Sequence, residues 1–132
     1  MPGILFRTCI YTTIAPEKLE KAARLRGATT FVVGQRMVKA KKHFMEAKNL
    51  GIEMGILFSD SRCCRNLLYF SRVVSISVQG KNTHIGVSNL RRLGKNRHTW
   101  ELVKDSDGKK ISRGFIRPYA VVKTPGYVRK IV

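Results

Sequence analysis

Apolar residues recur with a helical period in the first third of the chain. In 15–26 and 35–49 they return every three or four positions, which is typical of a helix that packs through one face. Gly27 and Gly51 follow these segments, and glycine commonly ends a helix. The apolar positions of the second segment are Met37, Ala40, Phe44 and Ala47. This pattern predicts two early helices, the second of which has a basic outer face.

Runs rich in β-branched and aromatic residues predict strands in the rest of the chain. They cover 4–12, 29–33, 52–58, 67–78, 83–87, 99–103 and 115–122. We expect a polar loop at 59–66, a helical turn at 88–93 and a tight turn at Asp107-Gly108. Early helices followed by short strands predict one α+β domain over residues 1–132. Its core is a small curved sheet or β-barrel, with the two helices packed outside.

The charge balance points to a polyanionic partner. The 132 residues include 26 Lys+Arg and 8 Asp+Glu, so the formal net charge is +18. Such an excess opposes compaction, and nucleic acid is the partner that best explains it, RNA ahead of DNA. A membrane-binding protein would usually show a dominant basic amphipathic helix or a terminal polybasic cluster, so we expect no membrane partner. The oligomeric state is left open.

Several classes of protein do not fit the sequence. No apolar run reaches the about 20 residues that span a bilayer, and no signal-peptide pattern is present, so we expect a cytoplasmic or nucleoid-associated protein. The three cysteines (Cys9, Cys63 and Cys64) form neither a disulfide framework nor a zinc pattern. Phosphate-loop and dinucleotide fingerprints are absent. We therefore expect no metal and no cofactor.

Candidate nucleic-acid contacts fall in three basic segments. Lysine and arginine meet phosphates, and neighbouring aromatic rings can stack on unpaired bases. The phosphate contacts are expected from the face of the second helix, from the 59–66 loop and from the segment that ends at Trp100. They are Arg36, Lys39, Lys42, Arg62, Arg65, Arg91, Arg92, Lys95 and Arg97. Trp100, Tyr69 and Tyr119 are the candidate stacking residues.

Two further functions remain open. His84 and His98 belong to similar segments, GKNTH at 80–84 and GKNRH at 94–98. With a lysine or arginine beside each, they have the parts of a metal-independent ribonuclease: an acid, a base and cationic stabilisation. The other alternative is a basic structural component of a nucleoprotein assembly.

The order of elements resembles a known superfamily. A basic helix before Gly51 is followed by the strand pair GIEMGILFSDSR…LLYFSRVVSISV and by a late strand in GFIRPYAVVKTP. This order resembles the PUA-like superfamily, in particular its EVE and ASCH branches, which are small β-barrels with helices outside. The resemblance implies a pocket that accepts a base, modified in EVE-type domains, or a hydrolase or nuclease site in some ASCH-type members. The residues that would line it are Tyr11, Ser59, Asp60, Arg62, Trp100 and Tyr119.

Overall fold

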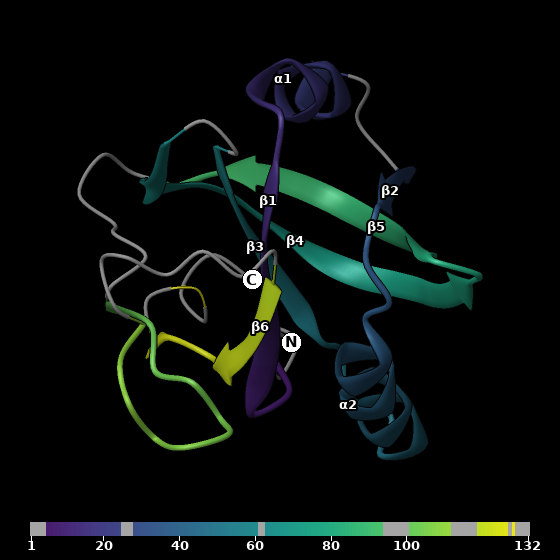
Figure 1. Cartoon of the computed structure of the whole chain (residues 1–132), viewed down its shortest axis with the longest axis vertical. Coiled ribbons are helices and arrows are strands. Elements are labelled where there is room, and N and C mark those ends of the chain that lie inside the picture. Colours follow the sequence, from purple (N-terminus) through teal and green to yellow (C-terminus); the bar gives the residue numbers. More distant parts are fainter. Residues whose placement is uncertain are drawn as a thin grey trace.

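The computed structural model describes residues 5–24, 28–60, 63–93, 101–111, 119–126 and 128. Two helices and six strands follow one another within these residues (Figure 1). In chain order they are β1 (Thr8–Ile14), α1 (Pro16–Arg24), β2 (Thr29–Val33), α2 (Val38–Asn49), β3 (Gly55–Asp60), β4 (Cys63–Gln79), β5 (Asn82–Arg92) and β6 (Tyr119–Lys123). The predicted α+β class and both early helices are confirmed.

The strands form one mixed sheet in the order β2-β5-β4-β3-β1-β6. β1 and β3 are parallel, and the other neighbouring strands are antiparallel. Among the described strands, β2 and β6 end the sheet without pairing to each other, so the sheet is open. Of the two architectures expected, the described residues therefore form the sheet and not the closed barrel. Figure 1 shows β4 and β5 crossing β1 at a large angle.

The length of β4 explains this curvature. It has 17 residues and pairs with β3 through one part and with β5 through most of its length. Its register with β5 shifts between Phe70 and Arg72 and again between Val73 and Ser75. Such irregularities bend a strand and increase its twist. As a result, β4 joins two parts of the sheet that face different directions.

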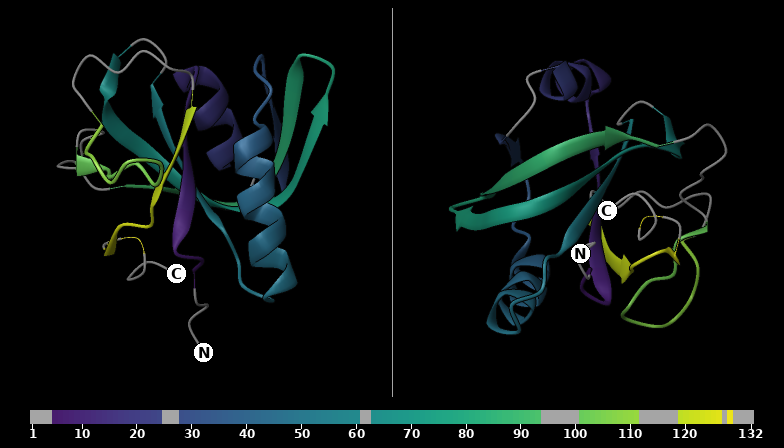
Figure 2. Two further views of the ribbon diagram at one scale, coloured as in Figure 1. Left: turned by 60° about the horizontal axis from the view of Figure 1, so that its bottom comes forward. Right: turned by 180° about the vertical axis from the view of Figure 1, so that it is seen from behind.

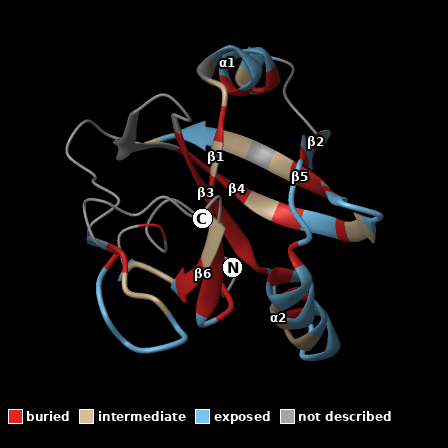
Figure 3. Ribbon diagram, viewed as in Figure 1, coloured by how far each residue is buried: buried red, intermediate tan, exposed pale blue. Residues whose placement is uncertain are grey.

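Each face of the sheet carries its own apolar core, because successive strand residues point to opposite faces. The first core lies under the helices and includes Ile10, Ile56, Phe58 and Ile85 of the sheet. The second core includes Tyr11, Leu57 and Phe70, and is covered by Leu102 and Ile111 of the segment 101–111. Figure 2 shows the helices and this segment on different sides of the sheet, and Figure 3 shows the buried strand centres.

Three local predictions were wrong. The strand expected at 99–103 does not form in its described part, where Val103 makes only an isolated bridge to Lys110. The other two concern polar segments. Residues 88–92 continue β5 and do not form a helical turn. The segment 59–66 is not a loop throughout, because β3 runs to Asp60 and β4 begins at Cys63. In both of these segments polar residues occupy a strand. The sheet tolerates them because its hydrogen bonds join backbone N–H and C=O groups, which pair whatever the side chains are. The turn at Asp107-Gly108 is confirmed, with φ of 70° at Gly108.

No helix within the described ranges is both long and apolar enough to cross a membrane.

Candidate functional site

The outer face of α2 is the most basic surface of a single element among the described residues. Met37, Ala40, Phe44 and Ala47 are buried, as the helical period predicts. The opposite side must then face solvent, and Figure 3 shows exposed residues along it. Residues 36–48 contain five cations and one carboxylate. Lys39, Lys41, Lys42 and Lys48 belong to α2, whereas Arg36 precedes the helix, which begins at Val38 and not at the expected 35. All five cations are exposed, and we call them together the α2 face.

A cavity of about 160 Å³ lies beside this face. Lys39 and His43 of α2 form one wall, and Tyr119 of β6 contributes to another. The turn that follows Val103 supplies Lys104, Asp105 and Ser106. Backbone pairing holds that turn in place: the Asp105 amide donates to the Val121 carbonyl at 3.0 Å, and the Lys123 amide donates to the Val103 carbonyl at 2.8 Å.

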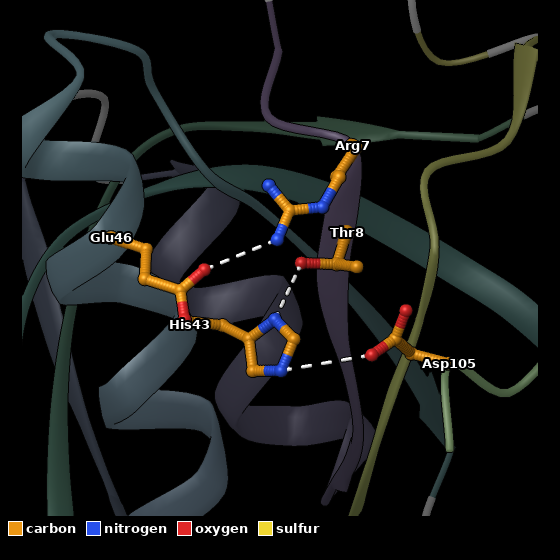
Figure 4. Close-up of polar contacts among 5 residues, drawn as sticks. All are labelled: Arg7, Thr8, His43, Glu46 and Asp105. Carbon is orange, nitrogen blue, oxygen red and sulfur yellow. Dashed lines mark hydrogen bonds and ion pairs between the residues drawn. The ribbon is translucent and has the colours of Figure 1, made fainter.

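His43 connects the cavity to the sheet (Figure 4). Its Nδ1 lies 2.9 Å from Thr8 Oγ1, within hydrogen-bonding distance. Its Nε2 lies 3.8 Å from Asp105 Oδ2, which is an ion pair when the imidazole is protonated. The imidazole is therefore oriented by a buried hydroxyl on one side and faces a carboxylate on the other.

Several carboxylates near the site are already paired. Arg7 Nη2 donates to Glu46 Oε2 at 3.1 Å, and Lys104 Nζ lies 3.1 Å from Asp107 Oδ2. The pKa of Asp107 is lowered, first by the hydrogen bond from the Lys109 amide and then by Lys104. Among the described residues no ion pair involves Arg36, Lys39, Lys41 or Lys42. Glu46 is paired with Arg7, so these four cations have no paired carboxylate among the described residues.

The arrangement suits anion binding better than covalent catalysis. The cavity is large enough for a phosphate group, and its wall contains Lys39, Lys104 and His43 together with the carboxylate of Asp105. The Thr8 hydroxyl is buried, with 1% of the residue exposed, so a substrate cannot reach it. The buried Cys9 thiol has its pKa raised to about 12 by desolvation, so it is not a thiolate nucleophile. Within the described ranges, no three His, Cys, Asp or Glu side chains gather as metal ligands.

Three of the expected base-pocket residues lie in the cores. Tyr11 is 1% exposed, and its hydroxyl lies 2.8 Å from Oγ of the buried Ser59. Tyr69 is 6% exposed and packs in the first core. Tyr119, in contrast, is partly exposed and lines the cavity beside α2.

The predicted basic segment is divided by its strand conformation. Arg91 pairs with Phe70 and Arg92 with Tyr69, so the two exposed side chains leave opposite faces of β5. Figure 1 places this end of β5 across the molecule from α2. The structure therefore does not join Arg91 and Arg92 to the α2 face in one surface.

The remaining expectations are placed as follows. His84 lies within β5, between Val32 of β2 and Ser77 of β4, and is partly exposed. His98, its proposed catalytic partner, lies outside the described residues. So do four candidate binding residues, which are Arg62, Lys95, Arg97 and Trp100. The side chains of Asp60 and Arg65 are not described either. For all of these, the sequence predictions stay predictions.

Sequence reasoning missed the groups that complete the cavity. His43 stands four residues after Lys39, and this spacing already predicts both on the basic outer face of the helix, but not the cavity beside them. Lys104 and Asp105 are about 60 residues away from His43 in the chain, and only the pairing of their turn with β6 brings them there. No local pattern marks such a contact.

Comparison of the chain with family models, with curated proteins and with solved structures found no match.

Proposed function

We propose that the protein binds nucleic acid, RNA ahead of DNA, through the outer face of α2 and the cavity beside it. The observation that carries the proposal is the set of four exposed cations, Arg36, Lys39, Lys41 and Lys42, without ion pairs among the described residues. Phosphates along a nucleic-acid backbone supply the missing counter-charge. Binding the phosphates releases the salt cations that had condensed on the nucleic acid, and this release supplies affinity. A cytoplasmic or nucleoid-associated location and a PUA-like relationship are parts of the same proposal.

The cavity gives this surface one defined contact. Lys39 belongs both to the α2 face and to the cavity wall, so a phosphate held between Lys39 and Lys104 continues the path of a backbone along the helix. His43 lies in the same wall and is oriented by Thr8. Asp105 lies in the same wall, 3.8 Å from His43 Nε2, so Lys39 and Lys104, and not the imidazole, are the proposed phosphate contacts.

The test is a titration of labelled single-stranded RNA, duplex RNA and duplex DNA across a salt series. Each phosphate contact contributes about 0.7 to the logarithmic salt slope for a single strand and about 0.9 for a duplex. Replacing Arg36, Lys39, Lys41 and Lys42 together by glutamine should therefore lower the slope by about 3 to 4. These side chains are exposed, so the fold should survive the change, which circular dichroism can check.

A matched control removes four exposed cations elsewhere: Arg24, Lys81, Lys109 and Lys110. This variant has the same net charge as the α2 variant and should keep most of the wild-type slope. Equal losses in the two variants would show that charge alone matters, and the α2 face would not be the site. Weak binding of all three probes by the wild type at moderate salt would end the proposal.

The same samples test the alternative functions. Shortened RNA after incubation would favour the ribonuclease, whose cleavage should disappear in His84→Ala and His98→Ala. Binding without preference for length or type of nucleic acid, together with dependence on a protein partner, would favour a structural component of a nucleoprotein assembly. Intact probes with a clear ranking support a binding module.

A further inference from the structure

A groove of about 380 Å³ lies between α1 and β2, apart from the α2 face. Its apolar wall contains Ile14, Ala22 and Phe31, each at most 7% exposed, together with the exposed Val32. Lys18 and Lys21 of α1 also line it. The groove is at the lower end of the about 300–1,000 Å³ usual for small-ligand sites, which is large enough for a nucleoside.

The helical spacing of α1 explains why both lysines reach this groove. Lys18 and Lys21 are three residues apart and share one side of the helix with Ala22, whose side chain is buried. Glu17 and Glu20 do not line the groove. The two lysines therefore border the groove on its α1 side, and no carboxylate is among the described lining residues.

The position of β2 adds polar groups to the same place. β2 is the last strand of the sheet and pairs, among the described strands, with β5 alone. Phe31 and Val32 are successive strand residues that point to opposite faces, and both line the groove, so the groove follows the outer edge of the strand. An edge strand leaves alternate backbone N–H and C=O groups unpaired. These groups can hydrogen-bond the edge of a base.

We propose that the groove between α1 and β2 holds one unpaired nucleobase, with Lys18 and Lys21 contacting the phosphates beside it. The face of the base stacks on the apolar wall, and its polar edge hydrogen-bonds to the backbone of the edge strand. The lysines neutralise the phosphates of the nucleic acid. A paired base offers neither its hydrogen-bonding edge nor both its faces, so the groove selects single-stranded nucleic acid. This inference depends on the proposed function and names its substrate class.

The first experiment compares Val32→Glu with Val74→Glu. Both valines are exposed to a similar extent, 52% and 55%, and both lie on strands, but Val74 does not line the groove. A carboxylate at position 32 opposes the phosphates and the base at once. We expect about tenfold weaker binding of single-stranded RNA, the effect of losing one stacked base, and less than about twofold change for duplex RNA. Val74→Glu should change both affinities by less than about twofold.

The second experiment locates the base directly. Single-stranded RNA that carries 4-thiouridine is crosslinked by light to the wild-type protein, and the attached peptide is identified by mass spectrometry. Crosslinks within 14–22 or 29–32 are expected, and they should fall at least fivefold in Val32→Glu.

The two proposals fail in different ways. Binding that depends on the α2 cations, with crosslinks only outside the groove and no response to Val32→Glu, overturns this inference and leaves the proposed function intact. Equal losses for single-stranded and duplex RNA in Val32→Glu also overturn it. Failure of the wild type to bind any probe overturns both.

Discussion

Gly55, at the start of β3, offers a sharp test of how tightly the second core is packed. A Cβ added at this position would lie 2.6 Å from Cε1 and 2.8 Å from Cζ of Phe70. Carbon atoms in contact prefer about 3.5–4.0 Å, so the ring would have to retreat by about 1 Å. Phe70 is only 2% exposed and packs in the core with Leu57 and Leu102, which leaves it little room to move.

Gly55→Ala should therefore destabilise the protein by about 1–3 kcal/mol, the usual cost of overpacking a core. With a urea slope of about 1–3 kcal/mol per molar, the midpoint of unfolding should fall by about 1 M, which circular dichroism can follow. Phe70→Leu should relieve the clash, so that Gly55→Ala costs less in that background than in the wild type.

Gly86→Ala is the matched control. There the added Cβ would lie 2.5 Å from Ser75 Oγ, a small exposed group that can rotate away. Alanine also reduces the freedom of the unfolded chain, so this variant should lie within about 0.5 kcal/mol of the wild type. If Gly55→Ala were equally harmless, the close packing of β3 against Phe70 would be refuted.

Two more predictions concern buried groups. Thr83 is fully buried, and its hydroxyl donates to the Gln35 carbonyl at 2.6 Å and accepts from the Met37 amide at 2.9 Å. Thr83→Val would leave both backbone groups unpaired. It should therefore lower the free energy of unfolding, measured in urea, by about 1–3 kcal/mol. Thr83→Ser, which keeps the hydroxyl, should cost less, and equal losses would contradict this explanation. Burial raises the pKa of Cys9 from 9.0 to about 12, so the stability that the neutral thiol contributes is present below about pH 9 and is lost as the pH rises toward 12. Between pH 8 and 10.5 the free energy of unfolding should fall less steeply in Cys9→Ala than in the wild type. The two slopes should differ by up to about 1.4 kcal/mol per pH unit. Parallel curves would contradict the raised pKa.

The elements that the sequence predicted well are those with a strong local signal. Both bounds of β2 match the expected 29–33, because a short run of Thr, Phe and Val has one structure that suits it. The buried stripe also matches, because Ala40, Phe44 and Ala47 are the buried residues of α2 and Met37 at its N-cap is buried as well. Here local preference and tertiary packing agree.

The errors occur where tertiary pairing decides the conformation. Residues 88–92 carry the polar and basic sequence Ser-Asn-Leu-Arg-Arg, yet Arg91 and Arg92 pair with β4 because β4 is long enough to extend the sheet. The same limit applies to Tyr11, whose sequence neighbourhood does not reveal that its hydroxyl meets Ser59 from a strand 48 residues away. A tyrosine hydroxyl suits a binding pocket, and it suits a core in which it is hydrogen-bonded equally well. Only the identity of the neighbouring strand distinguishes the two.

The arrangement of the helices explains how a chain with a net charge of +18 keeps its cations available. α1 and α2 place apolar residues on the same core, and their lysines stay exposed. Glu46 and Asp107 pair with Arg7 and Lys104, so these carboxylates do not neutralise the outer face of α2. Exposed like charges repel one another weakly in salt solution, because screening acts within about 10 Å, so the fold tolerates them. Under the proposed function a phosphate backbone would relieve that repulsion, so the exposed cations of α2, and not the total charge, are what the titrations above test.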